Sequence, residues 1–413
     1  MKKFFLSFLT FMLLLCSLPY QVVLADDLDL PAQSAIAVEA DTGKILYEKD
    51  SEKKRDVGGL STLLTTYLIF EAIHEKKLSL KDPIKLSEKA LALNDIEGAG
   101  TLPMEANQYT VEQLLTALLV GNSSTAALAL AEKVGGSEKS FVEKMKQKLA
   151  EWGIQSPHLI NATGLNTQTI SGDPDGKGDE NQLSAYDIAV IAKHLLQDFP
   201  EVTKYTSKPT ALFSNTQIEN PNLMLEGMPN YRSGVDGLRV SNSTKGGITF
   251  AASTTQNGIH MITVVLGVEA VDGDPYARFV ATSSLMNYVV RTFVSSIVVK
   301  EGDPYGKSKA TIMDGKSETV LAVAKKDFYI VEKQGSQAEP KIQFKSDQES
   351  FRAPVKSGTN LGKLHYTDPD KIGRGYLEDQ EPTVDMVAGR TIEKSFFLKV
   401  WWNEFVRYVN EKL

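Results

Sequence analysis

The chain has 413 residues, of which 42% are hydrophobic and 23% are charged, and its formal net charge is −7. This length allows two domains, or one large domain with appendages. The composition is that of a globular protein, and the lack of a dominant basic patch argues against nucleic acid as a partner.

The first 25 residues have the pattern of a secretory signal peptide. Lys2 and Lys3 precede the apolar run FFLSFLTFMLLLCSL, and the small residue Ala25 stands at the expected cleavage point. A membrane anchor is the alternative, but the run is shorter than the ~20 apolar residues that a spanning helix needs. Cys16 is the only cysteine, so the mature chain would have neither a disulfide nor a cysteine metal site.

The following segments predict a mixture of hairpins and helices. Residues 34–48, SAIAVEADTGKILYE, alternate apolar and polar side chains around DTG and predict a β-hairpin. A helix is expected over residues 60–76, and residues 111–133 predict two helical stretches separated by the polar GNSS. Polar residues inside so apolar a region indicate either a helix cap or the lining of a cleft.

The middle of the chain continues this alternation. FVEKMKQKLAEWG and SAYDIAVIAKHLLQDF predict amphipathic helices. Residues 168–182 between them are rich in glycine and acids, but no glutamate follows Asp173 at the spacing of a calcium loop, so a solvated loop without metal is expected. Residues 246–269 predict a hairpin around QNG, and a long helix is expected over 275–296.

The composition changes after residue 296. Residues 297–386 contain short β-like runs divided by Gly, Pro, Asn and Asp, which predicts a second, β-rich domain. Residues 387–413 predict an amphipathic helix, with Lys399, Asn403, Arg407 and Asn410 opposite an apolar face made of Phe397, Leu398, Trp401, Trp402, Phe405, Val406 and Val409. Two adjacent tryptophans favour the surface of a membrane over simple docking on the β-rich domain. Together with export and the lack of cysteine, this helix indicates the surface of a Gram-positive cell.

The order of these elements resembles the low-molecular-mass penicillin-binding proteins, which are serine-type D-alanyl-D-alanine carboxypeptidases. The resemblance covers most of the mature chain and rests on VEADTGKILYEKDSEKKR, LLTTYL, TVEQLLTALLVGNSSTAALALAE, NATGL, LSAYDIAVIAKHLL and YRSGVDGLRVSNSTKGG. It implies an α+β fold. Residues 26–296 would form the domain shared with class A β-lactamases, an antiparallel sheet flanked by helices. The β-rich domain (297–386) and the terminal helix (387–413) would follow.

The chemistry of that family needs three motifs. In S-x-x-K, a serine at a helix N-terminus attacks the D-Ala–D-Ala carbonyl, and a lysine one turn later takes its proton. The serine of S-x-N relays protons and its asparagine holds the substrate amide. The lysine and threonine of K-T-G, on a strand, hold the substrate carboxylate.

The nucleophile and the base of the first motif are missing. The flanking residues place Gly59 and Thr62 at these two positions. Glycine has no side-chain oxygen to acylate, and threonine is no base at neutral pH. The only S-x-x-K in the chain, Ser51–Lys54, stands in a charged loop, and Ser61 is expected to cap the helix.

The second motif reads Asn122-Ser123-Ser124. An asparagine thus stands where S-x-N has its serine, and a serine stands where it has its asparagine. No other set of residues restores a recognisable enzyme. The histidines, at positions 74, 158, 194, 260 and 365, are scattered, and Asp56 and Asp236 are expected to be cap and turn residues. We therefore expect no catalytic residues, no metal and no cofactor.

The third motif reads Arg239-Val240-Ser241. Arg239 keeps a positive charge, and its planar guanidinium can bind a terminal carboxylate through two hydrogen bonds. The alternative is a solvated strand residue. Val240, at the threonine position, has no hydroxyl to donate a hydrogen bond to the substrate carboxylate. Ser241, at the glycine position, narrows the space through which the peptide approaches the strand. The candidate substrate-binding residues are Arg239, Val240, Ser241 and Asn242.

Three functions remain open. The first is an inactive homologue of the carboxypeptidases on the outer face of the cell membrane, which binds peptidoglycan stem peptides or a wall-synthesis protein. The second is a working carboxypeptidase with non-standard residues, and the third is a surface adhesin or interaction protein. The pattern favours the first, because the core positions are intact and the changes fall where polar atoms would line a cleft.

Overall fold

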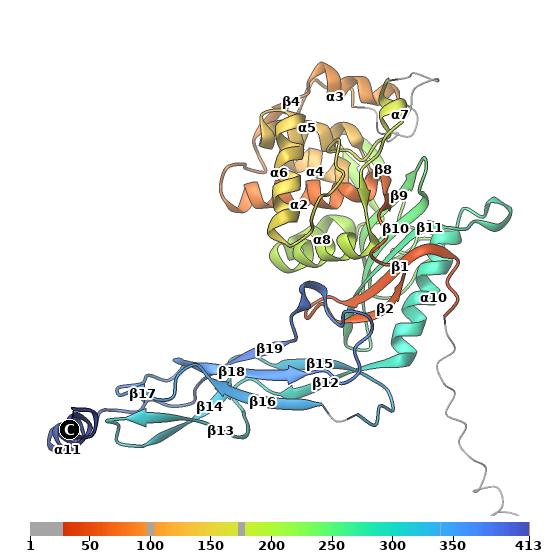
Figure 1. Ribbon diagram of the computed structural model, residues 1–413. Coiled ribbons are helices and arrows are strands. Elements are labelled where there is room, and N and C mark those ends of the chain that lie inside the picture. Colours follow the sequence, from red (N-terminus) through yellow and green to blue (C-terminus); the bar gives the residue numbers. More distant parts are fainter. Residues whose placement is uncertain (1–27, 97–101, 103, 172–177, 339, 413) are drawn as a thin grey trace, which may run out of the picture.

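The computed structural model describes residues 28–96, 102, 104–171, 178–338 and 340–412. The predicted signal peptide, residues 1–25, lies outside these residues. The chain forms an α+β domain with a helical lobe, a β-rich domain that extends away from it, and a terminal helix at the far end of the β-rich domain (Figure 1). This architecture confirms the expected fold class.

A five-stranded antiparallel sheet forms the centre of the first domain. Its order is β2-β1-β11-β10-β9, with β1 at Ala32–Glu39, β2 at Ile45–Lys49, β9 at Val235–Ser243, β10 at Gly247–Gln256 and β11 at Ile259–Val268. Both predicted hairpins, β1–β2 and β10–β11, are confirmed by their pairing. The inner strands β1 and β11 are buried along most of their length, because helices cover both faces of the sheet.

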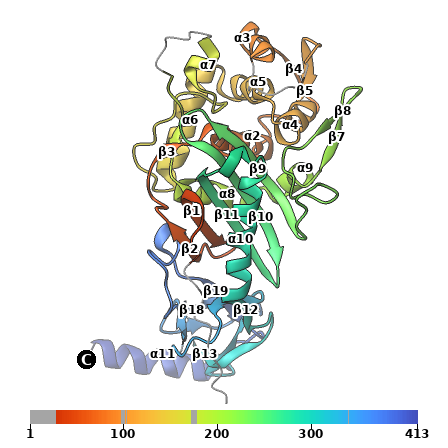
Figure 2. The ribbon, with the colours of Figure 1, turned by 90° about the vertical axis from the view of Figure 1, so that its right-hand side faces the viewer.

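Helices pack on the two faces of this sheet as separate layers (Figure 2). One face carries α10 (Ala277–Thr292), and the other carries α8 (Ala185–Asp198). The helical lobe beyond α8 contains α2 (Thr62–His74), α4 (Val111–Leu119), α5 (Ser124–Gly135) and α6 (Glu138–Glu151). Helix α10 ends at residue 292 rather than the predicted 296, because the Val-rich stretch that follows suits a strand and pairs with β15 (Phe328–Lys333).

Short elements complete the first domain. The strands are β3 (Arg55–Asp56), β4 (Pro83–Lys85), β5 (Gln108–Thr110), β6 (Gln182–Leu183), β7 (Thr210–Phe213) and β8 (Thr216–Glu219). The helices are α3 (Glu88–Ala92), α7 (Thr167–Ser171) and α9 (Thr203–Thr206), with the 3₁₀ turns η1 (Gly58–Ser61), η2 (Leu93–Asp95), η3 (Pro200–Val202) and η4 (Val271–Gly273).

The β-rich domain consists of two sheets. Strands β12 (Phe293–Val299) and β15 (Phe328–Lys333) pair with each other. The larger sheet has the order β16-β18-β19-β14-β13-β17, with β13 at Pro304–Met313, β14 at Thr319–Ala324, β16 at Lys341–Ser346, β17 at Phe351–Arg352, β18 at Asn360–Thr367 and β19 at Thr383–Ala388. A separate apolar core lies within this domain.

The segment between β18 and β19, residues 368–382, returns to the first domain and includes the turn η5 (Leu377–Asp379). Lys44 Nζ, in the β1–β2 turn, forms an ion pair with Asp368 Oδ2 at 2.7 Å, and both side chains are at most 2% exposed. Glu378 accepts hydrogen bonds from Lys193 Nζ at 2.8 Å and from the ring of His194 at 2.9 Å. The two domains are thus held together by polar contacts as well as by the covalent connection after α10.

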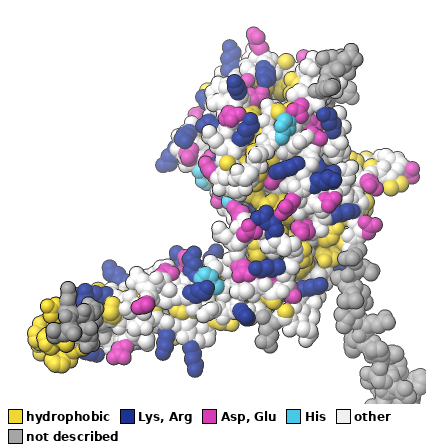
Figure 3. Space-filling view, viewed as in Figure 1, with side chains coloured by type: hydrophobic (Ala, Val, Ile, Leu, Met, Phe, Trp, Pro, Cys, Tyr) yellow, Lys and Arg dark blue, Asp and Glu magenta, His cyan; other side chains and the backbone are white. Residues whose placement is uncertain are grey.

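The terminal helix α11 covers Phe397–Lys412. It begins later than the predicted 387, because β19 extends to residue 388, and Ile392 and Lys394 form bridges with Val355 and Gly315. Trp401 and Trp402 are 63% and 58% exposed, and hydrophobic side chains gather at this end of the molecule (Figure 3). Within the described part of the chain, no helix is long and apolar enough to cross a membrane.

Candidate functional site

A cavity of 640 Å³ lies where strand β9 faces η1 and the start of α5. Its lining includes all of the predicted site positions except Thr62: Gly59, Asn122, Ser124, Arg239, Val240, Ser241 and Asn242. The order of strands explains this meeting, because β9 is the edge strand of the sheet and therefore lies against the helical lobe. The fold thus brings together three motif positions that are far apart in sequence.

No side-chain oxygen is present at position 59. The Gly59 N–H donates a hydrogen bond to Ser241 Oγ at 2.7 Å, and Thr62 Oγ1 donates to the Gly59 carbonyl at 2.6 Å. Ser61 Oγ donates to the Gly58 carbonyl and accepts a bond from Asn181 Nδ2. The prediction that Ser61 caps helix α2 is wrong, because η1 runs directly into α2 and Ser61 itself has helical backbone angles.

The predicted polar interruption between α4 and α5 both caps a helix and lines the cavity. Ser123 Oγ accepts a hydrogen bond from the Ala126 N–H and caps α5. Asn122 has a left-handed backbone, with φ of 57°, and its Nδ2 donates to the Val240 carbonyl at 3.0 Å. Ser124, 5% exposed, begins α5 at the wall of the cavity.

Arg239 is not a solvated strand residue, since it is only 5% exposed. Its Nη1 donates to the Leu118 carbonyl at 2.6 Å, whereas its buried Nε has no hydrogen-bond partner. Burial lowers the pKa of the Arg239 guanidinium to about 9, which leaves it charged at neutral pH. No described carboxylate forms an ion pair with it.

A second arginine, which no sequence motif marks, lines the same cavity. Arg278, near the start of α10, is 8% exposed, and its Nη1 donates to the carbonyls of Ser241 at 2.7 Å and Thr249 at 3.1 Å. Its Nη2 donates to Asn242 Oδ1. Burial lowers the pKa of Arg278 to about 10, so it too is charged at neutral pH, and no ion pair joins it to a described carboxylate.

The carboxylate that lines the cavity is that of Glu180, which is 1% exposed. It accepts hydrogen bonds from Ser243 Oγ at 2.6 Å, the Thr244 N–H at 2.9 Å and Asn166 Nδ2 at 3.0 Å. The expected solvated loop over 168–182 is therefore wrong for its last residues, which these bonds hold inside the protein. Residues 172–177 of that loop lie outside the described residues.

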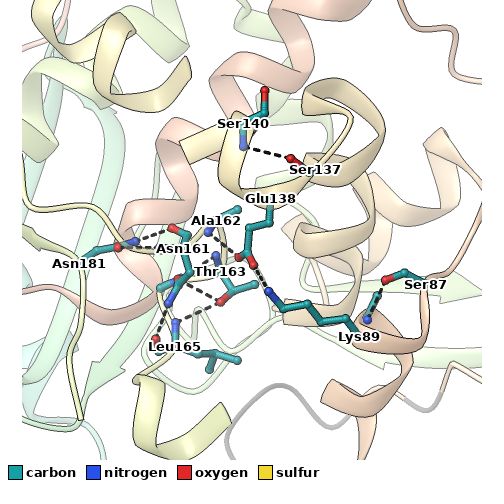
Figure 4. A network of polar contacts seen from close by, with 12 residues as sticks. Ser87, Lys89, Ser137, Glu138, Ser140, Asn161, Ala162, Thr163, Leu165 and Asn181 are labelled. Carbon is teal, nitrogen blue, oxygen red and sulfur yellow. Dashed lines mark hydrogen bonds and ion pairs between the residues drawn. The ribbon is translucent and has the colours of Figure 1, made fainter. Parts of the chain in front are cut away.

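The NATGL segment, residues 161–165, lines another side of the cavity with its residues 163–165. A network of polar contacts surrounds this segment (Figure 4). Asn161 Oδ1 accepts a bond from the Gly164 N–H at 2.7 Å, and Asn181 Nδ2 donates to the Asn161 carbonyl at 2.9 Å. Glu138, paired with Lys89, accepts from the Ala162 N–H at 3.0 Å. This network fixes the segment against η1, where a Cβ added to Gly164 would stand 2.2 Å from the Gly58 carbonyl oxygen.

Most of the other polar residues considered in the sequence lie in hydrogen bonds or ion pairs with neighbouring side chains. Asp56 lies in β3 and accepts from Gln182, and Asp236 lies in β9 and accepts from Ser253, so neither is the expected cap or turn residue. Ser51 donates to Glu48. Four histidines lie beside carboxylates: His74, His158, His194 and His260. No group of three potential metal ligands occurs among the described residues.

Comparison with known families agrees with this fold. Residues 21–270 match the D-alanyl-D-alanine carboxypeptidase family, and residues 293–394 match the C-terminal domain of penicillin-binding protein 5. The chain belongs to the D-alanyl-D-alanine carboxypeptidase family, the group of low-molecular-mass penicillin-binding proteins. It is 26% identical to the D-alanyl-D-alanine carboxypeptidase DacF of Bacillus subtilis (strain 168), over 81% of this chain and 80% of that protein.

Solved structures show the same likeness. A peptidoglycan synthesis regulatory factor (PBP3) from Streptococcus pneumoniae is 45% identical, with a TM-score of 0.85 over 89% of this chain and 100% of that chain. Penicillin-binding protein D2 from Listeria monocytogenes, in its ampicillin-bound form, is 26% identical, with a TM-score of 0.54 over 64% of this chain and 99% of that chain. The homologues are thus peptidoglycan proteins of the carboxypeptidase type.

Proposed function

We propose that this protein is a catalytically inactive member of its family, which binds peptidoglycan stem peptides at the outer face of the cell membrane. The observation that carries the proposal is a cleft lined by two buried cations, in which the predicted position of the attacking oxygen holds a glycine. Binding and catalysis are separable in this way, because they depend on different atoms of the cleft.

The loss of catalysis follows from Gly59 and Thr62. An acyl-enzyme needs an oxygen at position 59 and a base nearby, and in a serine protease the loss of the nucleophile alone costs about 10⁶ in turnover. A direct attack by water would need a general base. Glu180 is a poor one, because both of its oxygens already accept hydrogen bonds.

Retained binding is supported by the charges that line the cavity. Arg239 and Arg278 are buried guanidiniums without a carboxylate partner among the described residues. A buried cation is costly unless an anion neutralises it, so the cleft favours a ligand with a carboxylate. The end of a stem peptide is such a group, and the family relatives are named for their action on D-alanyl-D-alanine.

Attachment to the membrane is supported by α11. Its exposed aromatic side chains lie at the end of the molecule far from the cleft (Figure 3). An amphipathic helix with tryptophans is suited to lie in the interface plane of a bilayer. The predicted signal peptide would place the protein on the outer face of that membrane.

The experiment that tests inactivity is incubation with a fluorescent penicillin, followed by denaturing electrophoresis. The unaltered protein should carry no covalent label. The matched variant is Gly59→Ser/Thr62→Lys/Ser241→Gly, which restores the nucleophile, the base and the glycine of K-T-G. The third change is needed because a Cβ at position 59 would stand 3.0 Å from Ser241 Oγ.

Two outcomes decide between the candidate functions. Covalent labelling of the unaltered protein, or release of D-alanine from a pentapeptide, would refute the inactive assignment and favour a working carboxypeptidase. Labelling of the triple variant alone would locate the loss of activity at these positions. Binding of stem peptides is measured separately by calorimetry, and its absence would favour an interaction surface outside the cleft.

A further inference from the structure

The guanidinium of Arg239 stands beside the position of the missing nucleophile. A Cβ built on Gly59 would lie 3.8 Å from Arg239 Nη2. The other end of the group is fixed, because Nη1 donates to the Leu118 carbonyl at 2.6 Å. No described residue accepts a hydrogen bond from Nη2. A cation therefore faces the place where a serine of the family would attack the scissile carbonyl.

The backbone donor at the same place is already used. In acyl-transfer enzymes, backbone N–H groups at the nucleophile polarise the carbonyl that is attacked. Here the Gly59 N–H donates to Ser241 Oγ at 2.7 Å. Any peptide oxygen placed there would have to break this bond or bind Arg239 Nη2 instead. Val240, in addition, has no hydroxyl to hold the carboxylate that lies one residue further along.

We propose that the cleft prefers peptides that end in a single D-alanine over peptides that end in D-alanyl-D-alanine. This inference rests on the function proposed above and assigns its ligand. A peptide shortened by one residue carries its terminal carboxylate where the longer peptide carries an amide carbonyl. The carboxylate supplies a full negative charge to Arg239 Nη2, whereas the amide carbonyl leaves the buried cation without a counter-ion.

The chemistry of the ligand defines its source. A peptide ending in one D-alanine is what remains when a D-alanyl-D-alanine carboxypeptidase removes the last residue of its substrate. The reaction class that must supply this ligand is therefore the hydrolysis that the relatives of this chain perform. On this view the protein binds wall peptide that such an enzyme has already trimmed.

The test compares three probes by isothermal titration calorimetry on the exported chain, residues 26–413. They are diacetyl-L-lysyl-D-alanine, its C-terminal amide, and diacetyl-L-lysyl-D-alanyl-D-alanine. The free acid of the short peptide should bind about tenfold or more tightly than the other two, as expected for a charge-assisted hydrogen bond. Equal binding, or tighter binding of the longer peptide, would refute the preference and leave the proposed function standing. Binding of none of the three would contradict both.

Variants assign the preference to Arg239. Arg239→Gln should abolish the difference between the free acid and its amide, while Arg239→Lys should keep part of it. The matched control is Arg232→Gln. Arg232 is a half-buried arginine that donates to Asn287 and Gln256 and does not line the cavity. Retention of the full difference in Arg239→Gln would overturn the assignment. If that variant fails to fold, the comparison of acid and amide on the unaltered protein still decides.

Discussion

Replacement of Lys44 by methionine should destabilise the protein strongly, because Lys44 belongs to a buried ion pair between the domains. Its Nζ lies 2.7 Å from Asp368 Oδ2 and also donates to the Val331 carbonyl at 2.7 Å. The side chains of Lys44 and Asp368 are 2% and 0% exposed, so water cannot replace the lost partner. Asp368 would keep hydrogen bonds from the Tyr376 hydroxyl and the Asp370 N–H but would remain a buried, uncompensated charge.

The size of this effect follows from the burial. Loss of one partner of a buried pair costs about 3–5 kcal/mol, which for a domain of this size lowers Tm by roughly 6–20 °C. Calorimetry and urea unfolding of Lys44→Met measure it. The double variant Lys44→Met/Asp368→Asn should recover part of the loss, because it removes the unpaired charge. A loss below about 1 kcal/mol in Lys44→Met, or no recovery in the double variant, would refute the reasoning.

Three further predictions concern other parts of the molecule. Hydrogen bonds first from His194 and then from Lys193 lower the pKa of Glu378 from 4.5 to about 2. This contribution to stability is present above pH 4.5 and is lost as the pH falls towards 2. The Tm of Glu378→Gln should therefore fall less steeply with pH over this range than the Tm of the unaltered protein. Identical plots of Tm against pH for the two proteins would contradict this. Gly164→Ala should lower the free energy of unfolding, measured in urea, more than Gly227→Ala. Both glycines have a positive φ, which costs about 1–3 kcal/mol for alanine, but of the two only Gly164 would place its Cβ against a backbone oxygen. Equal losses in the two variants would contradict this clash. Removal of residues 395–413 should abolish sedimentation with anionic lipid vesicles, and undiminished sedimentation would exclude α11 as the attachment.

The regular elements could be predicted from the sequence because their signals are local. The alternation around DTG and QNG, the apolar periodicity of α2, α4, α5 and α8, and the polar GNSS all operate within a few residues. Helix ends were predicted less well, as α10 and α11 show, because strand pairing with distant segments decides where such a helix stops or starts.

For the site, the sequence could predict only which residues occupy the motif positions of the family that the chain resembles. The three predicted motif positions meet in one cavity, but what their side chains do there depends on contacts across long stretches of sequence. The hydrogen bond from Gly59 to Ser241 spans 182 residues, and that from Arg239 to Leu118 spans 121. Arg278 and Glu180 carry no local signal, since one lies in the first turns of a helix and the other ends an acidic loop.

The return of residues 368–382 to the first domain has a mechanical consequence. A domain joined by one covalent linker can swivel, whereas one that also docks a second segment against its neighbour resists rotation. On the proposed attachment, in which α11 lies flat on a lipid surface, such a stiff arm would hold the mouth of the cavity at one height above that surface and at one tilt. On the proposed function, the cavity could then bind stem peptides of the peptidoglycan at that height without any bending of the protein.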